Sequence, residues 1–282
     1  MSLVTRGQRL YLGAVAALAL WVGIWCFFVP AGSAKAIPWL VPPLCAAFLG
    51  AMYLSGAAFC GLSMLAGRWV EVRVIMPLIA LWTGGLNVIS FFYLPAFDWA
   101  RPQVWIWFGA YALYPAIAVW LLWVKRAERH SHPLGEPAIP AWARRYLRGQ
   151  AAVLGLLGLA LLCAPEPMLR LWPWQTGRLM LQLYSAPLLT YALGSLSFTR
   201  QHAWSEIRIG VAAIGVFMGC GLAGSLAHAD LLNGPALSVA LWLGALALGT
   251  AALAALSVAA WRAYHPAASA APRAAALEVT RL

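Results

Sequence analysis

Two six-residue stretches decide the fold: WVEVRV at residues 69–74 and WSEIRI at residues 204–209. Each stretch carries tryptophan, glutamate and arginine at every second position. The second stretch follows the first by 135 residues, so the sequence can be aligned with itself at that offset.

The same offset aligns much more of the chain. Residues 9–123 and 144–258 give 27 identities in 115 ungapped pairs. The matches include Pro38-Trp39 with Pro173-Trp174 and are not confined to the abundant alanine and leucine. A fixed period with matches of this kind predicts an internal duplication.

The composition excludes a soluble protein, because 63% of residues are hydrophobic and only 10% are charged, with a mean hydropathy of +0.78. Windows of 18 or more mostly apolar residues are typical of transmembrane helices. Eight such windows occur, at residues 11–29, 39–66, 74–94, 104–124, 147–164, 179–199, 209–229 and 236–261.

The sequence therefore predicts an all-α, polytopic membrane protein with eight transmembrane helices, arranged as two four-helix repeats. Four spans per repeat is an even number, so the repeats enter the membrane in the same direction, related by a pseudo-two-fold axis along its normal. The expected divisions are a first repeat at 1–124, a basic linker at 125–143, a second repeat at 144–261 and a disordered tail at 262–282.

The first span resembles a signal peptide in one respect, because Arg6 and Arg9 precede an apolar run that ends near Ala34-Lys35-Ala36. We expect it to be retained, since its counterpart at the 135-residue offset is an internal span.

Basic residues predict the orientation. Fifteen of the 19 lysines and arginines fall on one side of the predicted spans, together with both termini. This excess marks the cytoplasmic side and explains the formal net charge of +11 without nucleic acid as a partner. The same side would attract anionic lipid headgroups. An alanine- and arginine-rich chain with few lysines indicates a GC-rich bacterium and hence its inner membrane.

The repeated Trp-x-Glu-x-Arg motif is the leading candidate site, and its members are Trp69, Glu71, Arg73, Trp204, Glu206 and Arg208. Interfacial tryptophan and arginine anchor helices against headgroups, and a first-turn glutamate favours the helix dipole. Residues two apart do not face each other on a helix, so each glutamate is expected to pair across to another element, for which the other repeat is one candidate. The alternative is a gate or a partner contact.

Other candidates are fewer. Asn87 and Gln182 are polar residues within spans, where helix-to-helix hydrogen bonding is commoner than ligand binding. Arg178, His228 and Asp230 belong to a possible outer-face cluster, for which solvated loop charge is the alternative. The five cysteines have no metal-ligand spacing, so we expect no metal site, no cofactor and no catalytic residue.

The spans at 74–94 and 104–124 are rich in aromatic residues, whereas their counterparts carry mostly alanine, leucine and glycine. A bulky wall opposite a small-residue wall makes either a groove for a lipid, isoprenoid or pigment, or complementary packing between the repeats.

Three functions are compatible with this sequence. The first is a structural or accessory membrane subunit, or a binding protein, that docks with other membrane subunits. The second is a carrier for an uncharged or lipidic molecule at the interface between repeats. The third is an intramembrane enzyme acting on a lipid. No carboxylate lies in the middle of a span, which argues against ion-coupled transport.

Overall fold

The computed structural model describes residues 2–39, 41–128, 136 and 138–264. Within these residues, eight helices are long and apolar enough to cross a membrane. This confirms the predicted all-α fold with eight membrane spans. The chain is therefore a multi-pass helical membrane protein.

The long helices are α1 (Arg6–Phe28), α2 (Pro43–Leu65), α4 (Ile75–Phe91), α5 (Pro102–Val124), α6 (Ala141–Cys163), α8 (Arg178–Phe198), α9 (Arg208–Ala227) and α10 (Ala236–Tyr264). Their ends differ from the predicted ones by a few residues, and local chemistry explains the difference. Helix α1 begins at Arg6 because Thr5 and Gln8 form a reciprocal capping box. Helix α2 begins at Pro43, later than expected, because proline suits the first helical position, where its missing N–H is not needed.

Short elements connect the spans. They are η1 (Pro30–Lys35), α3 (Trp69–Val72), η2 (Leu94–Ala96), η3 (Arg126–Glu128), α7 (Pro165–Leu171), η4 (Trp204–Glu206) and η5 (Ala229–Leu231). The two Trp-x-Glu-x-Arg stretches begin in α3 and η4, which contact each other at one end of the bundle.

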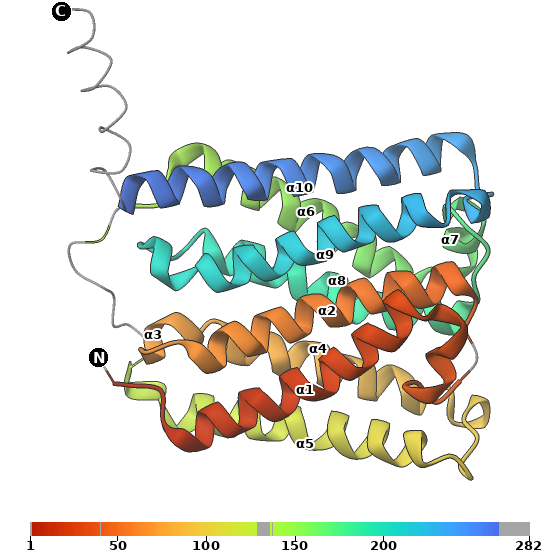
Figure 1. Cartoon of the computed structure of the whole chain (residues 1–282), viewed down its shortest axis with the longest axis horizontal. Helices are drawn as coiled ribbons and strands as arrows, with labels where there is room; N and C mark the ends of the chain where they lie inside the picture. The colour runs from red at the N-terminus through yellow and green to blue at the C-terminus, as the bar shows by residue number, and fades with distance from the viewer. Residues whose placement is uncertain (1, 40, 129–135, 137, 265–282) are drawn as a thin grey trace, which may run out of the picture.

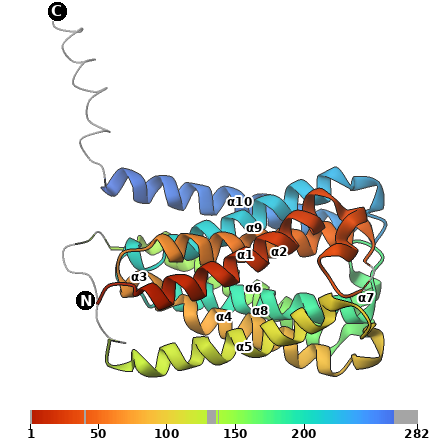
Figure 2. The ribbon, with the colours of Figure 1, turned by 60° about the horizontal axis from the view of Figure 1, so that its bottom comes forward.

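The helices pack into one bundle in which α5 and α10 lie at opposite edges (Figure 1). Helix α2 packs against α1 and α9, and helix α8 packs against α6 and α4. The outer contacts are completed by α5 on α4 and by α10 on α9. The turned view in Figure 2 shows the same order, with α10 and α5 again on opposite sides. Helices from the two halves of the chain therefore interlock, because α2 meets α9 and α4 meets α8.

Aromatic side chains show how deeply the halves interlock. Phe48 of α2 makes ring contacts with Trp174, Tyr184 and Trp242, at centroid distances of 5.4, 4.9 and 4.9 Å. All three partners come from the second half of the chain. Aromatic pairs at such distances add to the stability gained by burying their rings. One core cluster accordingly contains residues from both halves.

Trp39 and Trp174, which match at the 135-residue offset, both lie in this core. They are 8% and 3% exposed. The indole N–H of Trp39 donates to Sδ of Met180, and that of Trp174 donates to Sγ of Cys45, each at 3.2 Å. The N–H groups are thus satisfied inside the protein, so these rings need no contact with headgroups.

The predicted linker and tail are only partly described. Lys125 caps the end of α5, and the next three residues form η3. Glu136 forms an ion pair with Arg68. Residues 129–135 and 137 of the linker, and residues 265–282 of the tail, lie outside the described residues. Residues 262–264 belong to α10.

Candidate functional site

The two repeated glutamates form ion pairs that cross between the halves of the chain. The guanidinium of Arg208, at the start of α9, donates to Oε2 of Glu71 in α3. In the opposite direction, Arg73 donates to Oε1 of Glu206 in η4 at 2.6 Å. Each half therefore supplies one carboxylate and one guanidinium. We call these four residues the ionic clamp.

The ionic clamp is unequally buried. The side chains of Glu206 and Arg73 are 0% and 9% exposed, and that of Glu71 is 5% exposed. Arg208 is half exposed. A carboxylate buried at this level is stable only if its oxygens are paired and hydrogen-bonded.

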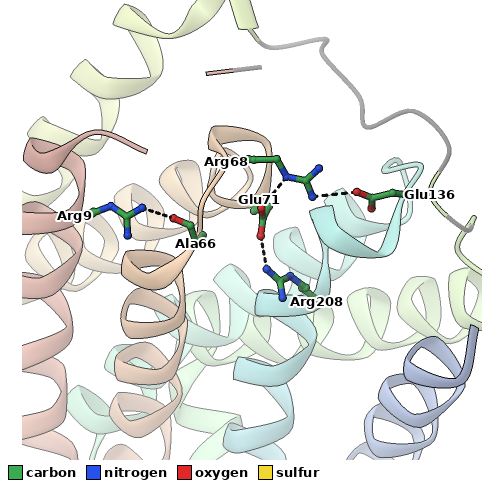
Figure 3. Close-up of polar contacts among 6 residues, drawn as sticks. All are labelled: Arg9, Ala66, Arg68, Glu71, Glu136 and Arg208. Carbon is green, nitrogen blue, oxygen red and sulfur yellow. Dashed lines mark hydrogen bonds and ion pairs between the residues drawn. The ribbon is translucent and has the colours of Figure 1, made fainter. Parts of the chain in front are cut away.

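Additional donors satisfy both carboxylates. Oε2 of Glu206 accepts the backbone N–H groups of His202 and Ala203 at 2.9 and 3.0 Å. Glu71 accepts from Arg68 at 3.0 Å, and a second nitrogen of Arg68 donates to Glu136, also at 3.0 Å (Figure 3). The hydrogen bond to Glu71 raises the pKa of Arg68. Figure 3 also shows Arg9 donating to the carbonyl oxygen of Ala66, at the end of α2.

This arrangement corrects one expectation about the motif. Trp69 is only 2% exposed and lies in a core cluster, so it does not anchor the protein in the headgroup layer. The carboxylates of Glu71 and Glu206 both form ion pairs with arginines of the protein itself. The geometry therefore supports a clamp between the halves more directly than a gate or an acid–base pair.

A groove with a volume of about 890 Å³ lies between α4 and α8. One wall comes from α4 and includes Gly85 and Val88; the other comes from α8 and includes Ser185, Ala186 and Leu189. The helices approach closely beside it, because a Cβ added to Gly85 would lie 3.0 Å from that of Ala186. Small residues at such a crossing are typical of helix pairs in membranes.

The groove has one polar end. Arg178, Gln182 and Tyr93 line it there, whereas the rest of the lining is almost entirely apolar. The amide of Gln182 donates to the carbonyl oxygen of Leu162 at 2.8 Å and accepts the hydroxyl of Tyr93. Arg178 lies 3.6 Å from Glu166, and both side chains are more than half exposed. An exposed pair of this length contributes little, so Arg178 remains available to a ligand.

The sequence pointed to Gln182 and Arg178 but did not place them in one groove. The structure brings both to the α4–α8 interface, between residues of the two halves. Asn87 lies on α4 but is not among the residues that line this groove. Its Oδ1 atom is buried and has no hydrogen-bond partner among the described residues.

The aromatic residues of α4 and α5 are divided between packing and cavities. Phe92 and Tyr93 line the groove. Trp107 is buried and donates to Oγ of Ser90 at 2.9 Å. Trp82 and Tyr111 line a separate apolar pocket of about 60 Å³, where the Tyr111 and Tyr53 hydroxyls share a hydrogen bond. Both predicted roles of these aromatic residues therefore apply in part: some line a groove or pocket, and others pack in the interior.

In the part of the chain that the structure describes, no ion pair joins the three members of the possible outer-face cluster. His228 caps the end of α9 and is half-buried, whereas Asp230 is exposed in η5. The ion pair of Arg178 is made with Glu166 and with neither of these residues. Among the described residues, no three histidine, cysteine, aspartate or glutamate side chains are grouped to hold a metal ion.

Comparisons with family models, with curated proteins and with solved structures find no match to this chain.

Proposed function

We propose that this protein is a membrane-embedded binding protein that holds a lipidic molecule in the groove between α4 and α8. The observation that carries the proposal is the shape and lining of this groove, with one polar end and an apolar remainder. A volume of about 890 Å³ lies within the range of roughly 300–1,000 Å³ typical of ligand pockets. A molecule with a polar head and an apolar chain matches this distribution.

The groove favours binding over the alternatives. A carrier at this interface would need a polar-lined cavity near the polar span residues Asn87 or Gln182. Only Gln182 lines the groove, and its amide is held by Leu162 and Tyr93. An enzyme would need the motif carboxylates to face a substrate, whereas they face arginines. An accessory subunit that binds lipid and docks with other membrane subunits is compatible with the same groove.

We further infer that the groove arose at the interface of a duplicated unit. Contacts recur at the 135-residue offset: Trp107 donates to Ser90, and Trp242 donates to Ser225. The isolated bridge between Leu3 and Arg68 has a counterpart between Ala138 and Ala203. Arg9 donates to the carbonyl oxygen of Met64, and Arg144 donates to that of Thr199. These recurrences support two parallel four-helix repeats at 1–124 and 144–261.

The proposed location is the bacterial inner membrane, with both termini and the ionic clamp on the cytoplasmic side. The charge distribution supports this orientation. In this arrangement Arg178 lies at the outer side. This orientation is tested with two variants of a cysteine-free protein, Thr176→Cys and Gln201→Cys, each of which carries a single cysteine. An impermeant maleimide applied to intact inner-membrane spheroplasts should label position 176 and should reach position 201 only after lysis.

Native mass spectrometry of the detergent-solubilised protein tests lipid binding. The wild type should retain a lipid that survives mild activation. Val88→Trp should reduce this retention, because Val88 lines the groove, is 58% exposed there and has room to be replaced by a larger ring. Val119→Trp on α5 is the matched control, since Val119 is 57% exposed but lies outside the groove. Equal lipid retention by Val88→Trp and the wild type would contradict the proposed function. Co-purification with other membrane proteins would identify partner subunits.

A further inference from the structure

The chemical class of the ligand follows from the charge at the polar end of the groove. We infer that the groove selects a bilayer phospholipid with a net anionic headgroup, whose phosphate lies against Arg178 while an acyl chain follows α4 and α8. This inference rests on the proposed function, because it concerns the same groove.

The first argument is charge. Arg178 is the charged residue of the lining, and every other lining residue is neutral. An arginine guanidinium offers several N–H donors in a planar fork that matches phosphate oxygens. Glu166 is the acidic neighbour of Arg178, but it stands at 3.6 Å and is 66% exposed. A phosphate that approaches Arg178 therefore competes with a weak, solvated pair.

The second argument is position along the helix. Arg178 begins α8, and Gln182 and Ser185 follow at spacings of four and three residues, on the same face. This row leads from a charged group through an amide and a hydroxyl to Ala186 and Leu189. The lining changes from polar to apolar in the order in which a phospholipid changes from headgroup to glycerol backbone to chain.

The third argument comes from the other interface between the halves. At the 135-residue offset, the counterparts of Arg178 and Gln182 are Pro43 and Ala47. A Cβ added to Gly224 of α9 would lie 3.2 Å from the ring of Phe27 and 3.6 Å from Ala47. Beside this ring the α2–α9 side keeps a smaller groove of about 450 Å³, lined by apolar residues such as Leu54 and Val216 and by no charged residue. Of the two grooves, only the one between α4 and α8 therefore has a cation at its polar end to receive a phosphate.

The experiment uses the full-length protein in nanodiscs that contain equal amounts of phosphatidylglycerol and phosphatidylcholine. The lipids that remain bound are identified by native mass spectrometry after release from the disc. Wild type should retain phosphatidylglycerol over phosphatidylcholine. Arg178→Gln should lower that preference by about tenfold, as expected when a hydrogen bond to a charged group is lost. Arg178→Lys should keep part of it, because the charge remains.

Matched variants separate this inference from the proposed function. Arg170→Gln removes an exposed cation of α7 that does not line the groove, so it should leave the preference unchanged. If Val88→Trp lowers total lipid retention but Arg178→Gln keeps the wild-type preference, the groove binds lipid without selecting charge, and this inference is wrong. If Val88→Trp retains as much lipid as the wild type, the proposed function itself fails.

Discussion

Glu206 and Arg73 form a buried ion pair, with 2.6 Å between carboxylate oxygen and guanidinium nitrogen, although they are 133 residues apart. The second pair of the ionic clamp, Glu71 with Arg208, runs in the opposite direction. Four side chains thus tie α3 and the residue that follows it to η4 and the start of α9. The two pairs differ in exposure, and that difference predicts different energetic roles.

Glu206→Gln should be strongly destabilising. The substitution leaves the positive charge of Arg73 buried at 9% exposure without its carboxylate, and breaking a buried pair in this way costs about 3–5 kcal/mol. Replacing both partners, as in Arg73→Met with Glu206→Leu, should recover much of the loss. Unfolding by a graded denaturant in mixed micelles measures these differences.

Glu71→Gln should cost less than Glu206→Gln. Its partners Arg68 and Arg208 are 39% and 50% exposed, so both cations reach solvent when the carboxylate charge is removed. The same unfolding measurement compares the two variants directly. Equal losses would show that exposure of the cation does not determine the cost.

Several features of this fold follow from local sequence. The eight spans depend on length and apolarity, and the start of α1 depends on Thr5 and Gln8, so both are accessible to sequence reasoning. The pairing of the motif glutamates with arginines of the other half also follows in part from the sequence. Side chains two residues apart on a helix point in different directions, so each glutamate needs a partner on another element.

The helix neighbours and the groove do not follow from local sequence. Nothing in the hydropathy of α4 or α8 indicates that they pack together, because uniformly apolar helices carry little information about which face meets which partner. The burial of Trp39 does not follow from local sequence either, because its contact with Met180 joins residues 141 positions apart. Gln182 and Arg178, spaced by four residues in an apolar span, were the available signal for the groove.

Gly210 is predicted to be essential for the close approach of α9 to Phe198, the last residue of α8. A Cβ at this position would lie 2.0 Å from the ring of Phe198, which is buried at 1% exposure. Gly210→Ala should therefore destabilise the protein by about 1–3 kcal/mol through overpacking. Gly149→Ala on α6 is the control, because open space surrounds that position. Combining Gly210→Ala with Phe198→Leu should restore stability, and failure of this rescue would refute the steric explanation.

Glu128 links the N-terminal segment to the end of α5. Its carboxylate accepts the Ser2 hydroxyl at 2.5 Å and the Lys125 ammonium at 2.9 Å. These hydrogen bonds, that from Ser2 foremost, lower the pKa of Glu128 from 4.5 to about 2. A lowered pKa contributes stability that is present above about pH 4.5 and is lost as the pH falls toward 2.

The difference in melting temperature between wild type and Glu128→Gln should accordingly be constant at neutral pH and shrink between pH 4.5 and pH 2. Lys125→Met removes one donor and should move the loss to a higher pH. A difference that stays unchanged down to pH 2 would mean that Glu128 does not titrate in this range.

The two halves of the chain should assemble when they are produced as separate polypeptides, cut between Glu128 and Glu136. Helix α2 packs on α9 and α4 packs on α8, so each half alone leaves its inner helices without their partners. Each half alone also loses the ion pair between Arg73 and Glu206, since these residues lie in different halves. Co-expressed halves should therefore co-purify on a tag carried by one of them, whereas either half alone should aggregate or be degraded.

Arg73→Glu places two carboxylates together and should prevent co-purification, while Arg126→Glu, at an exposed cation outside the interface, should not. Stable, monodisperse halves that do not associate would show that the interlocked core is dispensable for folding.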